Sequence, residues 1–396
     1  MMYQIGDGII SPLGVTTEEN YQAVRAGLTG IQQFPAGFRG LSHPILASLI
    51  SPRDLENLAA PYCGARTHMM SRYRQAMSAV FESAVSNTMP DIYHNEIFTS
   101  RRVALIFCTT KGDVDSFREL SDQTINPRLY PWHVPQRMMD ELKLPGKPYV
   151  VMNSTLSGLQ AQIMANRLLC KGSPYDFAVI IGVELISMFT IFILSEVGLI
   201  TDKTVRPYDQ DGTGTNPGES ASCAIYVSEE RYHKDRKCLN MPSVIKFKSG
   251  VVMTDPCSRR DPNPEGIALQ RAIKKVMAEE NVRNLSFINV HSVGLKSYDN
   301  MTSIAIEKAG LRKIPVNCFE GNFGHSSGST SLMNSILGAK SLQKGEILPT
   351  LGYKNHGVDG RILINTQLRT SRKHSFLNVS SGFGGVNAVA LFTKEK

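Results

Sequence analysis

The sequence lacks the segments that would place it in a membrane or export it. No apolar run reaches the roughly 18 residues that a membrane-spanning helix needs, and the most apolar stretch, residues 177–194, is interrupted by Glu184 and Ser187. The first residues have neither the basic start nor the apolar core of a secretory signal peptide. We therefore expect a cytosolic, cytoplasmic protein with no membrane span.

The number and spacing of the cysteines also do not suit a disulfide-bonded or zinc-bound fold. The seven cysteines are odd in number and include no Cys-x-x-Cys pair, which argues against a disulfide framework and a structural zinc site. No run of lysine and arginine is interleaved with aromatic residues, so nucleic-acid binding has little support. The formal net charge of +8 at pH 7 fits either a solvated basic surface or an acidic partner.

Apolar runs alternate with stretches of helical periodicity, which predicts a layered α/β fold. A length of 396 residues suffices for about two domain-sized units. The expected strands are Val103–Phe107, Tyr149–Met152, Phe177–Ile181, Phe287–Val290 and Val386–Phe392. The expected helices are Thr17–Ala26, Arg72–Ser86, Ser157–Leu169, Gly266–Glu279, Ser297–Ala309 and Thr330–Leu342.

A faint internal repeat runs through this pattern. Residues 149–172 read as a strand, a loop and a helix that ends in Lys-Gly, and residues 314–345 have the same order and ending. Two coincident residues are weak support for a duplication. The repeated order adds to it, because duplicated halves often place both active loops at one shared interface.

The turn Asn153-Ser154-Thr155-Leu156-Ser157-Gly158 joins a predicted strand to a predicted helix. A nucleophile at the start of a buried helix gains from unpaired backbone N–H groups, which favour developing negative charge. The same residue types also form ordinary helix N-caps. The turn by itself leaves both interpretations open.

Two histidines each follow a predicted strand or a glycine-rich turn. His291 ends the strand Phe287–Val290, and His325 lies in a glycine-bracketed loop before a long helix. Ligands in open α/β sheets bind near the carboxyl ends of strands, so both rings could converge on one pocket and donate to a thioester oxygen. They are 34 positions apart without clustered carboxylates or cysteines, which favours hydrogen bonding or acid–base work over metal binding. A structural role for either ring remains the alternative.

The glycine-rich segment Ser380–Asn387 predicts tight backbone with exposed N–H groups, which would suit an oxyanion hole or a simple hairpin. A second segment, Asp209–Gly214, faintly resembles a calcium loop. Its fifth position is Thr213 and its twelfth is Ser220, where a calcium loop needs a bidentate glutamate. We therefore expect no calcium site.

The order and spacing of these segments resemble the β-ketoacyl-acyl-carrier-protein synthases of the thiolase superfamily, almost from end to end. The matching segments are Gly6–Gly14, similar to the family's G-x-G-x-x-S-P-x-G; Ala26–Ile31; Arg206–Asp209 with Gly218-Glu219; Val290-His291; Gly324-His325 with Gly328; and Ser380–Asn387, similar to S-x-G-F-G-G-x-N. The resemblance implies a thiolase-like layered αβαβα fold made of two similar halves. We expect these halves at residues 1–232, with the nucleophile elbow near 149–169, and 233–396, with the histidine and glycine-rich loops.

The resemblance also implies roles for single residues. His291 and His325 would bind the malonyl thioester carbonyl and assist decarboxylation. The backbone N–H groups of Phe383 and residue 155 would form the oxyanion hole, and the Phe383 ring would act as a gate. Arg72 and Arg74 fall near the family's docking face for the acyl carrier protein, although a solvated helix face explains them equally well. No organic cofactor or metal is implied.

The sequence departs from the family at its most important position. Thr155 stands where the family has its nucleophilic cysteine, and Glu320 stands where it has a lysine before the second histidine. A hydroxyl has a far higher pKa than a thiol and is a poor acyl acceptor without an adjacent base. Cys108 is not a displaced nucleophile, because it lies on an earlier predicted strand. Condensing activity of this chain alone is therefore doubtful.

These features favour a chain-length-factor-like subunit of fatty-acid or polyketide biosynthesis, aryl polyene pathways included. It would form a heterodimer with a cysteine-bearing ketosynthase homologue, with a homodimer as the fallback, and would meet an acyl carrier protein. Three alternatives stay open. They are a malonyl-carrier-protein decarboxylase, a condensing acyltransferase acting with Thr155, and a noncatalytic acyl-binding scaffold.

Overall fold

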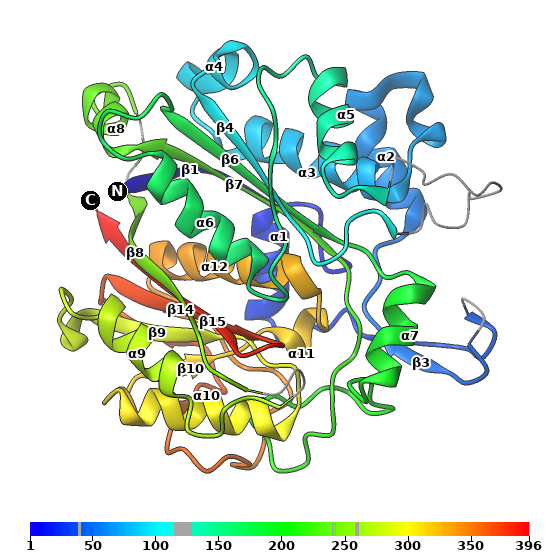
Figure 1. Cartoon of the computed structure of the whole chain (residues 1–396), viewed down its shortest axis with the longest axis vertical. Helices are drawn as coiled ribbons and strands as arrows, with labels where there is room; N and C mark the ends of the chain where they lie inside the picture. The colour runs from blue at the N-terminus through cyan, green and yellow to red at the C-terminus, as the bar shows by residue number, and fades with distance from the viewer. Residues whose placement is uncertain (39–40, 115–128, 240, 242, 258–260, 396) are drawn as a thin grey trace.

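The computed structural model describes residues 1–38, 41–114, 129–239, 241, 243–257 and 261–395. An eleven-stranded sheet runs through the molecule in the order β12-β10-β9-β14-β15-β8-β1-β7-β6-β4-β5. Its centre is the antiparallel pairing of β1 with β8, from Met2 opposite Phe247 to Gln4 opposite Ile245. The two chain ends lie close together beside this junction (Figure 1).

The two halves of the sheet repeat one pattern. The orders β5-β4-β6-β7-β1 and β10-β9-β14-β15-β8 are the same when the strands of each half are ranked along the chain. The first three strands in each order pair in parallel, and the remaining pairs are antiparallel. The first-half strands are β1 (Met2–Ile10), β4 (Val103–Cys108), β5 (Tyr149–Val151), β6 (Phe177–Glu184) and β7 (Ser220–Ser228). The second-half strands are β8 (Val244–Thr254), β9 (Leu285–Val290), β10 (Pro315–Asn317), β14 (Ser375–Gly382) and β15 (Val386–Glu395), with β12 (Leu363–Ile364) at the edge.

This repeated order matches the weak repeat in the sequence. The expected division between residues 232 and 233 falls inside helix α8 (Glu229–Asp235), and β8 begins at Val244. The placement of a boundary at that point stays a prediction.

Helices form three layers around the folded sheet (Figure 1). Helices α6 (Ser157–Leu168) and α12 (Ser327–Lys344) pack together between the two halves. The outer face of the first half is covered by α2 (Pro52–Cys63), α3 (Arg72–Thr88) and α5 (His133–Glu141). The outer face of the second half is covered by α9 (Ile267–Val276) and α10 (Lys296–Lys308). Three buried clusters of apolar side chains fill the spaces between these layers.

The sequence patterns explain most of these elements. Every strand and helix predicted above is present, with ends that agree to within three residues. Helix α1 (Thr17–Arg25) begins with a capping box of Thr16 and Glu19, which satisfies backbone N–H groups at the helix start. The remaining elements are α4 (His94–Thr99), α7 (Met188–Glu196), α11 (Glu320–Phe323), β2 (Gln32–Phe34), β3 (Ile45–Ala47), β11 (Glu346–Ile347) and β13 (Arg369–Thr370).

The segment that resembled a calcium loop serves the fold. The Asp209 carboxylate accepts hydrogen bonds from the backbone N–H groups of Asp211, Lys354 and Asn355, and Arg206 pairs with it at 2.8 Å. Asp209 therefore joins two distant loops. Among the described residues, no helix is both long and apolar enough to cross a membrane.

Helices α6 and α12 approach closely at Gly158. A Cβ atom on Gly158 would lie 2.6 Å from the backbone nitrogen and 2.6 Å from the Cβ of Leu332, well inside van der Waals contact. Only glycine fits this contact without a shift of one helix. Because Gly158 is in the first turn of α6, the contact also sets the position of the preceding turn.

We predict that Gly158→Ala lowers the free energy of unfolding by about 1–3 kcal/mol, the usual cost of overpacking a tight contact. Guanidinium chloride unfolding followed by circular dichroism would measure it. Arg167→Ala, at an exposed position of the same helix, is the matched control and should leave the midpoint nearly unchanged. An equal midpoint for Gly158→Ala and wild type would show that the helix contact is not constrained.

Candidate functional site

The turn between β5 and α6 is a strained elbow. Ser154 has φ +51°, a left-handed conformation that a non-glycine residue rarely adopts. Ser157 Oγ holds the turn by accepting from the Asn153 N–H at 2.8 Å and by lying 2.7 Å from the Ser154 carbonyl oxygen. The residue at the helix N-cap is Leu156, which provides no side-chain cap. The polar residues of the turn therefore stabilise the elbow and do not form an ordinary N-cap.

Thr155 lies in this elbow and faces the glycine-rich C-terminal loop. Its side chain is buried, and Oγ1 donates a hydrogen bond of 2.7 Å to the carbonyl of Ser381. A Cβ on the neighbouring Gly382 would lie 3.3 Å from Thr155 Oγ1, so the two loops are in close contact. The hydroxyl thus donates its hydrogen bond to a peptide carbonyl, which cannot remove the proton as a base.

The two histidine rings lie against each other. His291 Nε2 lies 3.2 Å from His325 Nδ1, and the ring centroids are 5.0 Å apart. The backbone of His291 is held by the Val379 carbonyl at 3.1 Å. The backbone of His325 is held from the other side, where its N–H donates to the Asn216 carbonyl at 2.8 Å. Two separate β-strands and a long loop are therefore needed to bring the rings together.

Burial keeps both rings uncharged. Removal from water, followed by the nearby Lys111 cation, lowers the pKa of His325 to about 4, against the Glu184 carboxylate, which raises it. Burial, followed by the adjacent His325, places the pKa of His291 well below its ordinary value, against a hydrogen bond with the Ser381 backbone. Near pH 7 each ring is neutral, so it can donate from one nitrogen and accept at the other. The Ser381 peptide also contacts both Thr155 and His291.

A buried carboxyl occupies the position where the resemblance places a lysine. Glu320 is 1% exposed, and its Oε2 accepts from the Cys318 thiol at 2.6 Å. Its Oε1 has no hydrogen-bond partner among the described residues. Burial raises the pKa of Glu320 to about 7, and the charge of Asp299 adds to the rise. Asp299 is itself buried and bonded to Ser292 Oγ at 2.7 Å, and burial raises its pKa to about 7.

Phe383 packs edge-to-face on Tyr298, with ring centroids 5.5 Å apart. It is half-buried and follows Ser381 and Gly382, which contact Thr155. This places the ring near the elbow. Its gating role, and the oxyanion hole made with the backbone of residue 155, stay predictions.

The two arginines predicted to dock a carrier protein are engaged within the chain. Arg72 pairs with the buried Glu219 at 2.8 Å and donates to the Ile50 carbonyl at 3.0 Å. Arg74 pairs with Glu141. Neither is an unpaired cation, because each pairs with a carboxylate, which is buried for Arg72 and exposed for Arg74. Carrier docking at these residues stays a prediction.

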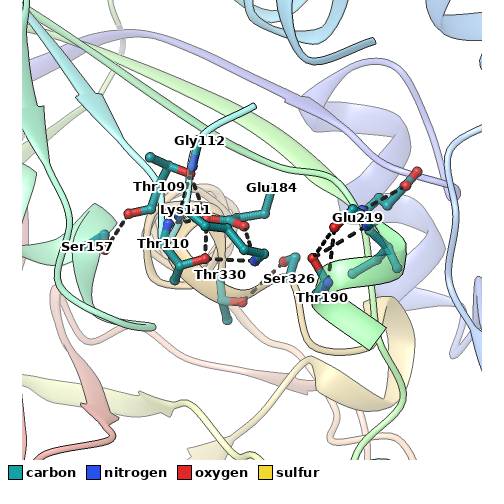
Figure 2. Close-up of polar contacts among 12 residues, drawn as sticks. Thr109, Thr110, Lys111, Gly112, Ser157, Glu184, Thr190, Glu219, Ser326 and Thr330 are labelled. Atoms are coloured by element: carbon teal, nitrogen blue, oxygen red, sulfur yellow. Dashed lines mark hydrogen bonds and ion pairs between the residues drawn. The ribbon is translucent and has the colours of Figure 1, made fainter. Parts of the chain in front are cut away.

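Sequence reasoning missed an ion pair that lies beside the elbow (Figure 2). Lys111 Nζ is 2.8 Å from Glu184 Oε2. Thr109 Oγ1 and Thr110 Oγ1 donate to Glu184 Oε1 at 2.8 and 2.7 Å. The available signal was a lysine three residues after the buried strand β4, together with a glutamate that ends the apolar strand β6. Among the described residues, no group of three or more metal-binding side chains is present.

Comparison with known proteins shows what this chain is similar to. Residues 246–354 match the family model described as beta-ketoacyl synthase, C-terminal domain. The chain is similar to the ketoacyl synthases. It is 27% identical over 200 residues to a putative mitochondrial 3-oxoacyl-[acyl-carrier-protein] synthase of Schizosaccharomyces pombe, which covers 48% of this chain and 46% of the relative. It is 24% identical to the tetracenomycin polyketide synthase ketoacyl synthase alpha subunit of Streptomyces glaucescens, over 48% of this chain and 45% of the relative.

Solved structures share the fold of this ketoacyl-synthase-like chain. A beta-ketoacyl synthase from Burkholderia phymatum superposes with a TM-score of 0.84 at 17% identity, over 100% of this chain and 99% of that one. The ishigamide ketosynthase/chain length factor superposes with a TM-score of 0.81 at 20% identity, over 99% and 98%. The expectation of a thiolase-like layered α/β fold is confirmed. The chain matches less than half of the length of the curated relatives named above.

The raised pKa of Glu320 predicts how stability depends on pH. The unfolded carboxyl loses its proton near its ordinary pKa of 4.5, whereas the folded one keeps it to about 7. Glu320 therefore contributes nothing at low pH and increasingly destabilises the fold as pH rises through this interval. Glu320→Gln should raise the free energy of unfolding at about pH 8, by an amount on the order of 1–3 kcal/mol.

Urea unfolding at both ends of the interval would measure this effect. The gain from Glu320→Gln should vanish at about pH 4, where both forms carry a proton. Glu230→Gln, an exposed exchange of the same chemistry, is the control and should change neither value appreciably. A gain that is independent of pH would mean that the Glu320 charge is not its cause.

Proposed function

We propose that this chain is a ketosynthase-like subunit of fatty-acid or polyketide biosynthesis that has given up the acyl-enzyme step. In this role it would pair with a cysteine-bearing ketosynthase, as a chain-length factor does, and would meet an acyl carrier protein. The observation that carries the proposal is the hydrogen bond from Thr155 Oγ1 to the Ser381 carbonyl.

The chemistry of that bond argues against nucleophilic catalysis. A hydroxyl becomes an effective nucleophile only when an adjacent base takes its proton. Thr155 directs its proton to a peptide oxygen, while His291 Nε2 is directed to His325. No imidazole nitrogen therefore accepts from Thr155 in this arrangement. A thiol at the same position would need less help, since the helix start lowers thiol pKa values and thiolates are strong nucleophiles.

The proposed pairing with a ketosynthase is supported by similarity to solved structures. One structural neighbour is a ketosynthase/chain length factor, and another is a ketosynthase of Xenorhabdus doucetiae in complex with its chain length factor. Strand β5 lies at the end of the sheet, where its outer edge is not paired by another described strand. A heterodimer is proposed, and a homodimer is the alternative that the experiment below separates from it.

We predict where an acyl group settles when this chain and a cysteine-bearing homologue are incubated with an acyl carrier protein. Intact-protein mass spectrometry should find the adduct on the homologue and none on wild-type Thr155. The Thr155→Cys chain should gain an adduct of its own, because the elbow and the start of α6 are intact. Native mass spectrometry of the same mixture should show a complex of the two different chains.

Three outcomes of this experiment would contradict the proposal. An adduct on Thr155 under turnover conditions would favour a condensing enzyme that uses threonine. Elongation of a primer by the chain alone would exclude a subunit that depends on its homologue. A complex containing only copies of this chain would favour the homodimer.

The neutral histidine pair supports a second candidate, a decarboxylase of malonyl carrier protein. His325 Nε2 makes no hydrogen bond to any described residue, and Nδ1 is occupied by His291. The free nitrogen can donate to a thioester oxygen. In decarboxylation the bond between the carboxylate carbon and Cα breaks, its electron pair moves towards the thioester oxygen as an enolate, and a proton then returns to Cα. Neither step needs an acyl-enzyme.

For this candidate we predict carbon dioxide release from malonyl carrier protein, reduced by about 10²–10³-fold in His325→Ala, as for loss of an oxyanion donor. His291→Ala should also reduce it, because His291 orients His325. Thr155→Val, which removes only the hydroxyl, is the control and should retain release. Equal release from wild type and both histidine variants would exclude the decarboxylase. Acyl binding without any release would instead favour a noncatalytic scaffold.

A further inference from the structure

The ion pair of Lys111 and Glu184 is the most enclosed pair of opposite charges near the histidines. The Glu184 side chain is 2% exposed and the Lys111 side chain is 17% exposed. A buried charge is costly unless it is paired and hydrogen-bonded. Such a pair therefore calls for an explanation in terms of either structure or chemistry.

The charged groups of both side chains make several hydrogen bonds. Besides Lys111, the Glu184 carboxylate accepts from the hydroxyls of Thr109 and Thr110 and from the Thr110 backbone N–H. Lys111 Nζ donates to Glu184 at 2.8 Å and to Thr110 Oγ1 at 2.9 Å. Figure 2 shows these side chains gathered around the carboxylate. The result is a cation with a fixed position.

The pair also contacts both loops of the site. Ser157 Oγ, in the first turn of α6, lies 3.2 Å from the Thr109 carbonyl. A Cβ on Gly328, three residues after His325, would lie 2.7 Å from the Thr109 carbonyl carbon and 3.0 Å from Glu184 Oε1. The elbow and the histidine loop thus rest on the same segment, Thr109–Lys111.

We propose that Lys111, fixed by Glu184, is a positioning residue for the histidine pair, because the segment that holds this cation is the one on which the loop of His325 rests. The functional purpose of Lys111 rests on the proposed binding of a thioester at this site. The effect of Lys111 on the titration of His325 does not depend on that binding, and it can be measured without a ligand.

The charges around His325 support this role. The charged groups that act on the ring are Lys111, which lowers its pKa, and Glu184, which raises it, after the larger effect of burial. The neutral His291 is the ring in direct contact. Glu320, at the position where the resemblance expects a lysine, brings no cation. Lys111 provides one from the loop that follows β4.

The test is a histidine titration by NMR between about pH 8 and pH 5, with His325→Gln used to assign the signal. The wild-type ring should not titrate in this range. In Lys111→Met the ring should begin to titrate, with a rise in pKa on the order of one unit, because a nearby like charge is lost and a carboxylate is left unpaired. Lys111→Arg keeps the charge and should behave as wild type.

Glu184→Gln separates charge from packing. It breaks the same ion pair but removes the group that raises the pKa of His325, so the ring should stay uncharged over the whole range. Similar titration in Lys111→Met and Glu184→Gln would show a general loosening of the site and overturn the proposal. So would an untitrated ring in Lys111→Met.

A second variant guards against misfolding. Lys111→Gln can still donate to Glu184 without a charge and should give the same rise as Lys111→Met. The titration is done without carrier protein, so its outcome is separate from the release assay. Absence of carbon dioxide release together with the expected titration would exclude the decarboxylase and leave the role of Lys111 in place.

Discussion

The close packing of α6 on α12 between the two half-sheets is the contact on which the site depends. At Gly158 and Leu332 the two helices meet with no room for a Cβ atom. The elbow precedes one helix and the loop of His325 precedes the other. Because both helix starts are fixed against each other, residues from the two halves of the chain share one interior. A wider separation would leave Thr155 and the histidines on unrelated surfaces.

The buried carboxylates of this interior differ in how many hydrogen-bond and ion-pair partners they have. Glu184 has a cation and three further donors, and Glu219 is held by Arg72 and by the backbone N–H groups of Ile50 and Ile186. Glu320 has a thiol and leaves one oxygen without a described partner. Buried carboxylates are stable when paired and costly when bare. The paired carboxylates therefore serve the architecture, whereas burial disfavours the charged form of Glu320 and raises its pKa to about 7.

Much of this protein could be predicted before its structure. Helix and strand periodicity located the main elements, and the ordered segments around His291, His325 and Phe383 indicated a resemblance to the ketoacyl synthases and the thiolase-like fold. The sequence could not indicate what each side chain touches. Arg72 and Arg74 looked like surface cations, but they pair with Glu219 and Glu141. Nothing in the sequence indicated that Lys111 is paired, because its partner Glu184 lies 73 positions away.

The sequence by itself determined that position 155 is a threonine, that both histidines are present and that position 320, where the resemblance expects a lysine, is a glutamate. These are matters of residue identity, which alignment of short ordered motifs can recognise. Tertiary structure alone decided that Thr155 donates a hydrogen bond to the Ser381 carbonyl, that the two imidazoles lie against each other and that the Lys111 cation comes from the loop after β4. Hydrogen bonds and charge effects act over a few ångströms, and such distances between remote residues exist only after the two half-sheets have closed around α6 and α12.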